Sequence, residues 1–229
     1  MLTMHNKAIR ALGIEELQSF TARLQAPIVS VGSGTGATER VLFEIDQDLE
    51  AGTDYICVDP EPTSYQQGDI VVEPHFATVS QLLERRPELE KHCDLFLNWP
   101  APNDNLVDWA AILLLKPRRI VLVLGTDGAS GGFALLNGLE AMNYNWAANL
   151  SDTTADFGWV EKTPHVDINY LQDNYEVAAV STCQSGSSHC GTIFRYILLR
   201  RKDVAVSKGV ESLNNYKYRD RQEGECRMF

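Results

Sequence analysis

The feature that most constrains the fold is the stretch Ile28–Glu39, which reads Ile-Val-Ser-Val-Gly-Ser-Gly-Thr-Gly-Ala-Thr-Glu. A short β-branched run meets three alternating glycines, Gly32, Gly34 and Gly36, and a helix-compatible segment follows. A strand, a glycine turn and a helix in this order let the backbone approach a nucleotide cofactor closely. The stretch therefore predicts a nucleotide-cofactor fold, and the rest of the chain must select the cofactor.

Length and composition indicate one good-sized domain with, at most, small extensions. The chain has 229 residues and a hydrophobic fraction of 44%, as in ordinary globular proteins. Its apolar runs are shorter than the roughly 20 residues that span a bilayer, and its N-terminal residues lack the apolar core of a secretory signal. We therefore expect an intracellular, cytoplasmic protein.

The cysteines favour a reducing compartment over a disulfide framework. There are five, an odd number, and Cys57 and Cys93 lie in apolar runs typical of core strands. Cys183, His189 and Cys190 lie close together in the sequence and could suggest zinc. They are three ligands without a second pair, so we expect no metal.

Charge is distributed unevenly along the chain. The net charge of −11 argues against bulk nucleic-acid binding by the main body. Residues 200–229 hold 8 Lys/Arg and 5 Asp/Glu, a balance of +3, whereas the other residues hold 12 and 26, a balance of −14. We interpret the basic tail as a solvated extension through which the chain could contact itself or a partner.

Hydrophobic periodicity predicts alternating helices and strands. Apolar residues share one helical face over 14–24, and Pro27 leads from that helix into the strand Ile28–Val31. The other elements predicted in the first two thirds are helix 37–49, strands 54–58 and 70–72, helix 76–86, strand 94–98, a helix ending at Leu115 and capped by Asn103 or Asp104, strand 119–124 and helix 133–148.

The last third of the chain changes character. Residues 149–173 are polar and irregular, and two strands follow, 175–182 and 192–201, joined by a loop too short for a crossover helix. We expect an α/β fold over residues 1–203, with a seven-stranded, mostly parallel sheet, helices on both faces and an antiparallel closing strand. Residues 204–229 form a polar, locally basic C-terminal extension.

Two cofactor families fit the glycine turn. Gly32, Gly34 and Ala37 match the nicotinamide fingerprint Gly-x-Gly-x-x-Gly/Ala literally. Both families also require a carboxylate at the end of the second strand to hold ribose hydroxyls, and Asp59 supplies one. The turn and this carboxylate alone leave both families open.

The closing hairpin separates the two families. An antiparallel hairpin after five strand–helix units is unusual for dinucleotide dehydrogenases, and it resembles the class I S-adenosylmethionine-dependent methyltransferase fold, whose seventh strand inserts antiparallel. The resemblance covers residues 14–201. Val-Gly-Ser-Gly-Thr-Gly at 31–36 resembles the family's first motif, which cradles the methionine part of the cofactor, and Cys-Val-Asp-Pro at 57–60 resembles the second, with Asp59 on the ribose.

This resemblance implies S-adenosylmethionine as the cofactor. Glu73, just past the predicted third strand, stands where the family often contacts adenine, although Asp69 could claim that role. The implied cofactor-binding residues are Gly32, Ser33, Gly34, Thr35, Gly36, Asp59 and Glu73.

The fourth motif departs from known patterns. Asn98-Trp99-Pro100 stands where this motif ends the fourth strand, followed by Ala101 and Pro102. Methyltransferases that act on amino groups of bases resemble Asn/Asp-Pro-Pro-aromatic, so here Trp replaces the first proline and Ala follows the second. The lysine–aspartate–lysine–glutamate set of ribose 2′-O-methyltransferases is not recognisable either. The motif therefore leaves the methyl acceptor open.

Methyl transfer from a sulfonium needs positioning and water exclusion more than acid–base help. Asn98, Trp99 and Pro100 are the candidate catalytic residues: Asn98 could orient an amine and Trp99 could stack on a planar or cationic acceptor. The candidate bases are His75, Asp127, His165 and Asp167. The glycine-rich loop 125–132 could close over substrate, and the aromatic-rich insertion 149–173 is the expected place for specificity.

We expect an S-adenosylmethionine-dependent methyltransferase whose acceptor is a small molecule or a protein rather than duplex nucleic acid. One alternative is a catalytically inactive methyltransferase-like binding or structural subunit, because the fourth motif is irregular and no base stands out. A third is a nicotinamide oxidoreductase, which would need a proton donor that the sequence does not display.

Overall fold

The computed structural model describes residues 14–45, 49–60, 72–98, 100, 106–125, 130–144, 166–184 and 193–203. They form an α/β fold with one mixed sheet of six strands in the order β2-β1-β3-β4-β6-β5. The elements are α2 (Ile14–Thr21), β1 (Ile28–Val31), α3 (Ala37–Ile45), β2 (Tyr55–Val58), α4 (Val79–Arg85), η1 (Pro87–Leu89), β3 (Asp94–Asn98), α5 (Val107–Leu115), β4 (Arg119–Gly125), α6 (Phe133–Ala141), α7 (Tyr170–Asn174), β5 (Tyr175–Gln184) and β6 (Ile193–Arg201).

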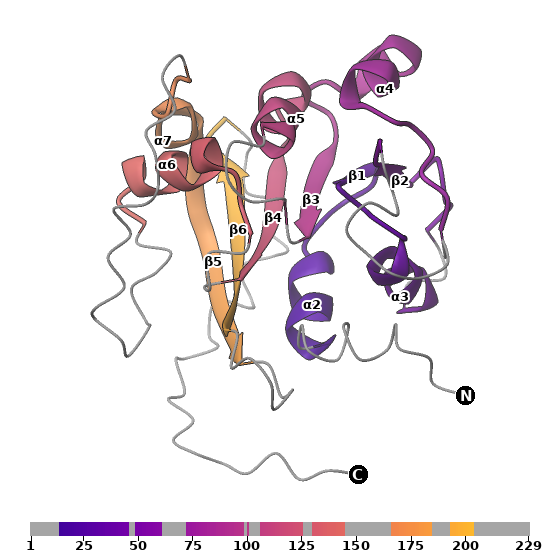
Figure 1. Ribbon diagram of the computed structural model, residues 1–229, viewed down its shortest axis with the longest axis horizontal. Coiled ribbons are helices and arrows are strands. Elements are labelled where there is room, and N and C mark those ends of the chain that lie inside the picture. Colours follow the sequence, from indigo (N-terminus) through magenta and orange to yellow (C-terminus); the bar gives the residue numbers. More distant parts are fainter. Residues whose placement is uncertain are drawn as a thin grey trace, which may run out of the picture.

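Helices cover both faces of the sheet. Figure 1 shows α4, α5, α6 and α7 on one side and α2 and α3 on the other. Because successive strand residues point to opposite faces, each buried strand contributes to two hydrophobic clusters. Val29 and Val31 of β1 pack with the α4–α7 side, whereas Ile28 packs with Leu17 and Phe20 of α2. The near-continuous apolar strands read from the sequence therefore belong to a sheet that is buried on both faces.

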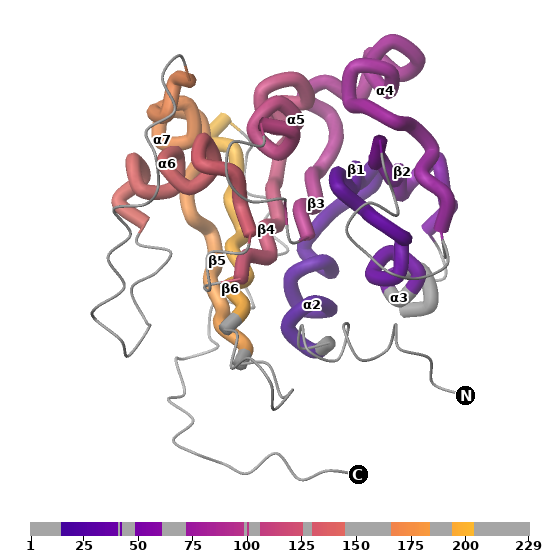
Figure 2. Tube along the Cα trace, in the orientation of Figure 1, coloured from indigo at the N-terminus to yellow at the C-terminus, as the bar shows by residue number. Residues whose placement is uncertain are grey.

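The last described strand, β6, lies inside the sheet. Strands β2, β1, β3 and β4 pair in parallel, whereas β6 is antiparallel to both β4 and β5. Figure 2 shows the yellow β6 between β4 and the orange β5. The predicted antiparallel hairpin is present. The expected seven-stranded, mostly parallel sheet is not matched, because the described residues contain six strands, with three parallel and two antiparallel pairings.

The strand missing from the expected seven is the predicted third strand, residues 70–72. Residues 70 and 71 lie outside the described part, and Val72 is not in a strand. The outer edge of β2 instead meets a single parallel bridge between Val58 and Phe76. The Phe76 carbonyl accepts from Asp59 N–H at 3.1 Å, and His75 N–H donates to the Cys57 carbonyl at 2.9 Å. A short extended segment thus covers this sheet edge, a few residues later than predicted.

Several predicted helix boundaries shift. The helices α2 and α6 end earlier than their apolar periodicity suggested, at Thr21 and Ala141, whereas α3 reaches Ile45, beyond which residues 46–48 lie outside the described part. The polar insertion predicted to be irregular contains α7. The predicted caps Asn103 and Asp104 lie outside the described residues, and the N-cap of α5 is Leu106, without a side-chain cap.

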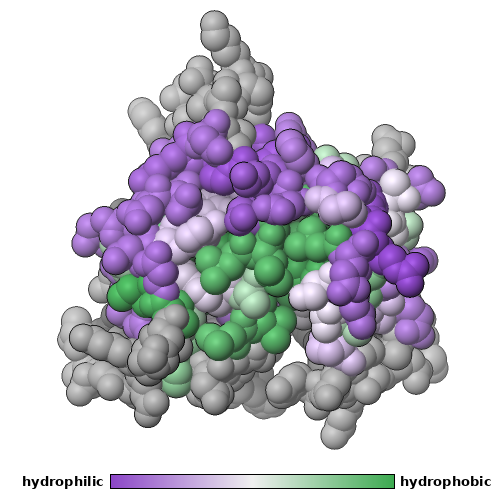
Figure 3. All heavy atoms as spheres, turned by 90° about the horizontal axis from the view of Figure 1, so that it is seen from above, coloured by the Kyte–Doolittle hydropathy of each residue, from purple (hydrophilic) through white to green (hydrophobic). Residues whose placement is uncertain are grey.

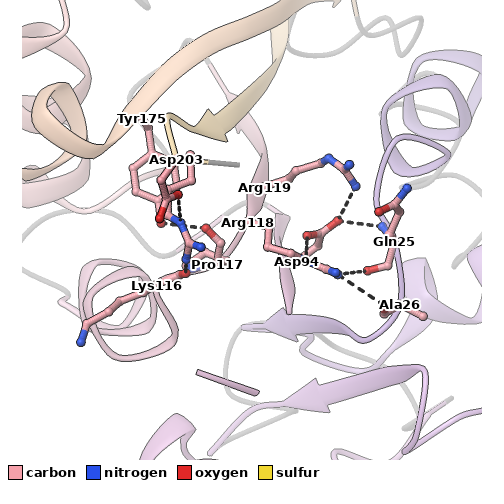
Figure 4. A network of polar contacts seen from close by, with 10 residues as sticks. Gln25, Ala26, Asp94, Lys116, Pro117, Arg118, Arg119, Tyr175 and Asp203 are labelled. Carbon is pink, nitrogen blue, oxygen red and sulfur yellow. Dashed lines mark hydrogen bonds and ion pairs between the residues drawn. The ribbon is translucent and has the colours of Figure 1, made fainter. Parts of the chain in front are cut away.

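A buried carboxylate fastens the amino-terminal edge of the sheet. Asp94, fully buried at the start of β3, accepts from Gln25 N–H at 2.7 Å, Arg118 Nε at 3.0 Å and Arg119 Nη1 at 3.1 Å (Figure 4). Arg118 also donates to the carbonyls of Gln25 and Ala26. Burial raises the pKa of Asp94 even though the two arginines lower it. The network joins the segment after α2 to β3 and β4.

Two further expectations concern the core and membranes. Cys57 and Cys93 are buried free thiols, as predicted, and burial raises the pKa of Cys93 to about 12. None of the described helices is long and apolar enough to cross a bilayer.

Candidate functional site

The glycine turn at the end of β1 is shaped by three left-handed residues. Gly32, Gly34 and Gly36 have φ angles of 72°, 56° and 73°, which side chains rarely adopt. A Cβ on Gly36 would lie 2.5 Å from the Cβ of Val72, so neighbouring backbone fills that position. A Cβ on Gly32 would meet nothing within 4 Å. The turn is closely packed at its far end and open where it leaves the strand.

Asp59 lies beside this turn, as the pairing of β1 with β2 requires. Val31 pairs with Val58, so the residues that follow both strands meet at one sheet edge. The Gly34 N–H donates to Asp59 Oδ2 at 2.7 Å. The structure therefore brings together the glycine turn and the carboxylate predicted to hold a ribose, at the carboxyl edge where open α/β sheets bind ligands.

The other predicted cofactor residues flank the turn. Ser33 and Thr35 are buried, and Ser33 Oγ has no hydrogen-bond partner in the described structure. The Thr35 carbonyl accepts from Val72 N–H at 3.1 Å. Glu73, the next residue, is exposed and adjoins this contact. An unpaired buried hydroxyl is costly, so Ser33 marks a place where a polar ligand would be stabilised.

The predicted catalytic corner is only partly described. Asn98 ends β3, and its Nδ2 donates to Thr38 Oγ1 of α3 at 2.9 Å. Its Oδ1 is buried and accepts no hydrogen bond from the described residues. Pro100 is buried, and its carbonyl accepts from Gly131 N–H at 2.7 Å. Trp99 lies outside the described residues. The Asn98 amide is thus held by α3 through its nitrogen, and its oxygen has no partner among the described residues.

A buried carboxyl that the sequence did not reveal lies under the turn. Glu39, in the first turn of α3, is fully buried, and Ser30 Oγ donates to its Oε1 at 2.7 Å. Its Oε2 has no partner in the described part of the chain. Desolvation raises the pKa of Glu39 from 4.5 to about 7, and the charge of Asp59 adds to that rise. The one available signal was Ser30, a polar residue inside an otherwise apolar strand.

His75, one of the predicted bases, is engaged at the edge of β2. Its Nδ1 accepts from Cys57 N–H at 2.9 Å, and the backbone N–H of His75 donates to the Cys57 carbonyl. Although His75 is exposed, partial desolvation of the ring lowers its pKa. This histidine therefore holds the edge segment onto the sheet, and its Nδ1 is not available to remove a proton.

The other predicted bases do not join the site. Asp167 is exposed, and its Oδ1 accepts from Asn169 N–H at 3.2 Å just before α7. Asp127 and His165 lie outside the described residues, as does most of the insertion 149–173.

The loop after β4 is closed at its base. Ser130 Oγ accepts from Gly125 N–H at 2.6 Å, and Asp108 Oδ2 accepts from Gly132 N–H at 3.0 Å. Asp108 is buried at the start of α5, and burial raises its pKa to about 6. Residues 126–129 lie outside the described part. Hydrogen bonds thus hold both ends of the predicted substrate loop, at Gly125 and Gly132.

Zinc finds no support among the described residues. No group of three or more His, Cys, Asp or Glu within them is placed to hold a metal ion. His189 and Cys190 lie outside the described residues.

Comparison with known proteins gives distant likenesses only. No protein-family model and no curated protein matches the sequence. A proposed hemolysin from Streptococcus thermophilus aligns over 87% of this chain and 68% of its own at 13% identity and a TM-score of 0.45. The methyltransferase domain of bacterial CtHen1 aligns over 85% of this chain and 100% of its own, at 11% identity and a TM-score of 0.42.

A third solved structure concerns the conversion of a disulfide bond into a thioacetal group during echinomycin biosynthesis. It aligns over 82% of this chain and 81% of its own, at 12% identity and a TM-score of 0.39. The neighbours thus include a methyltransferase domain, but none is close enough to assign this chain to a family.

Proposed function

We propose that the protein binds S-adenosylmethionine at the carboxyl edge of β1 and β2 and transfers its methyl group to a small molecule or a protein. The observation that carries the proposal is the 2.7 Å contact between Asp59 Oδ2 and Gly34 N–H. It fixes a carboxylate at the rim of a left-handed glycine turn. A nucleoside cofactor needs a ribose acceptor and a close backbone approach at the same place.

The residues present fit such a group. The space beside Gly32 would admit part of a ligand against the backbone, since a Cβ there meets no atom within 4 Å. A carboxylate offers about four acceptor sites on its two oxygens, so Asp59 can hold Gly34 N–H and still accept from ribose hydroxyls. The buried, unpaired Ser33 Oγ lies in the same turn and would gain a partner from a polar ligand.

The chain's own contribution to the reaction would be positioning. When bound, S-adenosylmethionine supplies an activated methyl group on a positively charged sulfur. The unpaired Asn98 Oδ1 would accept a hydrogen bond from an amine or hydroxyl of the acceptor. Thr38 holds the Asn98 amide in one orientation, so little rotational freedom would be lost when the acceptor binds. Trp99 and Pro100 would line the acceptor side.

The hydrogen bonds that already occupy His75 and Asn98 favour the alternative of a binding subunit without catalysis. His75 Nδ1 is engaged by Cys57 N–H, and Asn98 Nδ2 by Thr38. Among the described residues, His75 is the predicted base that lies at this edge, and its Nδ1 already accepts a hydrogen bond. In this alternative the cofactor would bind without turnover.

Calorimetric titration distinguishes these proposals. We expect heat release and saturation with S-adenosylmethionine and S-adenosylhomocysteine, and none with NADH. Asp59→Asn replaces a charged acceptor by a neutral one and should weaken both Kd values by about 10- to 100-fold. Asp54→Asn is the matched control, because Asp54 precedes the opposite end of β2, where its carboxylate accepts from Glu50 N–H.

Absence of any heat with the two sulfur cofactors would refute the cofactor assignment, and binding of NADH alone would favour an oxidoreductase. Transfer of a labelled methyl group to small molecules or proteins by the purified chain would exclude the binding subunit.

A further inference from the structure

Helix α5 has a second apolar face, which points away from the sheet. Its buried side includes Trp109, Ile112 and Leu115. On the other side, Leu106, Val107, Leu113 and Leu114 are between 36% and 45% exposed. Figure 3, which looks onto the layer of α4–α7, shows an apolar area bordered above and at its sides by hydrophilic residues. Ala110 is also exposed, so the apolar positions follow helical spacing. We call residues 106, 107, 110, 113 and 114 the α5 face.

The α5 face is too small to hold two copies together. Five half-exposed aliphatic side chains present on the order of 300 Å² of apolar surface, about the size of the largest patch on a typical monomer. A stable protein–protein interface buries roughly 800 Å² on each partner. A segment of the same chain does not face this limit, because tethering gives it an effective concentration in the millimolar range.

The chain leaves the described structure beside this face. Arg201, the last residue of β6, donates from its backbone to the Arg118 carbonyl at 2.9 Å and from its guanidinium to the Lys116 carbonyl. Lys116 is the C-cap of α5. The Lys202 N–H donates to the Asn174 carbonyl at 2.9 Å. Residue 203 therefore lies near the C-terminal end of α5, and residues 204–229 continue from there.

The sequence after residue 203 matches the α5 face in spacing and length. Val206, Val210 and Leu213 repeat at i, i+4 and i+7, the spacing of one helical face. Eight residues from 206 to 213 would span about 12 Å as a helix, close to the roughly 13.5 Å of the nine-residue α5. Val206, the first of these three residues, follows the last described residue by only three positions, so it is within reach of Leu113 and Leu114.

We propose that residues 204–213 bind across the α5 face of their own chain, antiparallel to α5. Val206 would then contact Leu113 and Leu114, Val210 would lie over Ala110, and Leu213 would reach Leu106. The small Ala110 side chain leaves room for close approach of the second segment. This inference does not depend on the proposed function.

Limited trypsin digestion of the full-length protein tests the contact. Lys208 lies within the proposed contact, whereas Arg219 lies beyond it. Cleavage rates are divided by those of a synthetic peptide of residues 204–229, which removes the intrinsic preference of each bond. We expect cleavage after Lys208 to be at least about tenfold slower, relative to the peptide, than cleavage after Arg219, because proteolysis follows the population of the open form.

Leu114→Glu on the α5 face and Val210→Glu in the tail should each abolish this protection, so that the two normalised rates agree within about twofold. Ser80→Glu places the same charge on an exposed position of α4 and should leave the protection unchanged. Equal normalised rates in the wild type, or protection that survives Leu114→Glu, would overturn the proposal. So would sedimentation that depends on concentration in the wild type and not in Leu114→Glu, which would assign the face to a second copy.

Discussion

Glutamine at position 39 should change how the stability of the protein depends on pH. The carboxyl of Glu39 is fully buried in the first turn of α3, where its Oε1 accepts from the hydroxyl of Ser30. Its pKa is about 7 in the folded chain against an ordinary 4.5. Glu39→Gln imitates the protonated form at every pH while keeping the shape of the side chain.

The sign follows from proton binding. Below pH 4.5 the carboxyl is protonated in both states and causes no penalty. Between pH 4.5 and 7 the unfolded chain loses the proton while the folded chain keeps it, so the wild type loses stability as pH rises. The difference of about 2.5 pKa units, at 1.36 kcal/mol each, corresponds to roughly 3 kcal/mol above pH 7. Relative to the wild type, the glutamine variant should therefore gain up to that amount between pH 4.5 and 8.

Urea denaturation of both proteins at pH 5, 6, 7 and 8 measures the difference in unfolding free energy. Glu140→Gln, at an exposed position of α6, supplies the baseline for the same substitution in solvent. A difference between Glu39→Gln and wild type that stays constant within about 0.5 kcal/mol across this range would refute the reasoning. Ser30→Ala removes a hydrogen bond that lowers the pKa of Glu39 in the folded chain, so the loss of stability should still begin near pH 4.5 but extend to higher pH and become larger.

Four further substitutions test the turn and the two polar anchors by urea denaturation. Gly32→Ala should destabilise by about 1–2 kcal/mol, the cost of a left-handed side chain, whereas Gly36→Ala should cost at least about 3 kcal/mol because its Cβ also collides with Val72. Equal losses would contradict the packing described for the turn. Asp94→Asn leaves two arginines without their buried carboxylate and should cost about 2–3 kcal/mol; a loss below about 0.5 kcal/mol would show that the network contributes little. Ser130→Ala removes the acceptor of a buried backbone N–H and should cost about 1–3 kcal/mol, and an unchanged midpoint would mean that water replaces the hydroxyl.

The strands were predictable because they are apolar runs bounded by turn residues. The predicted strand 94–98 coincides with β3, and the predicted strand 119–124 falls one residue short of β4. The hairpin at the end of the chain was also predictable, since its loop is too short for a crossover helix. Where apolar runs are short, the prediction failed: three residues at 70–72 gave too little signal to place an edge strand, and tertiary contacts placed the bridge at Phe76.

The candidate site was predictable only at the backbone level. Three alternating glycines predict left-handed turns, and Asp59 after the neighbouring strand predicts a carboxylate at the same edge. Side-chain partners follow no such pattern. The engagement of His75 by Cys57 depends on how an edge segment folds back onto β2, and the position of Glu39 depends on its contact with Ser30 of β1. Contacts between distant segments are decided by packing, which local sequence does not encode.

The insertion of β6 between β4 and β5 has a consequence for how the protein is made. Strand β5 pairs only with β6 among the described strands, so it has no place in the sheet until residues 193–201 have been synthesised. Throughout that interval β4 presents a bare backbone edge, which is a template for wrong pairing with other chains. A nascent chain that stops before residue 193 would therefore lack two strands rather than one. The last described strand, β6, completes the sheet from within, which makes late synthesis the stage most vulnerable to aggregation.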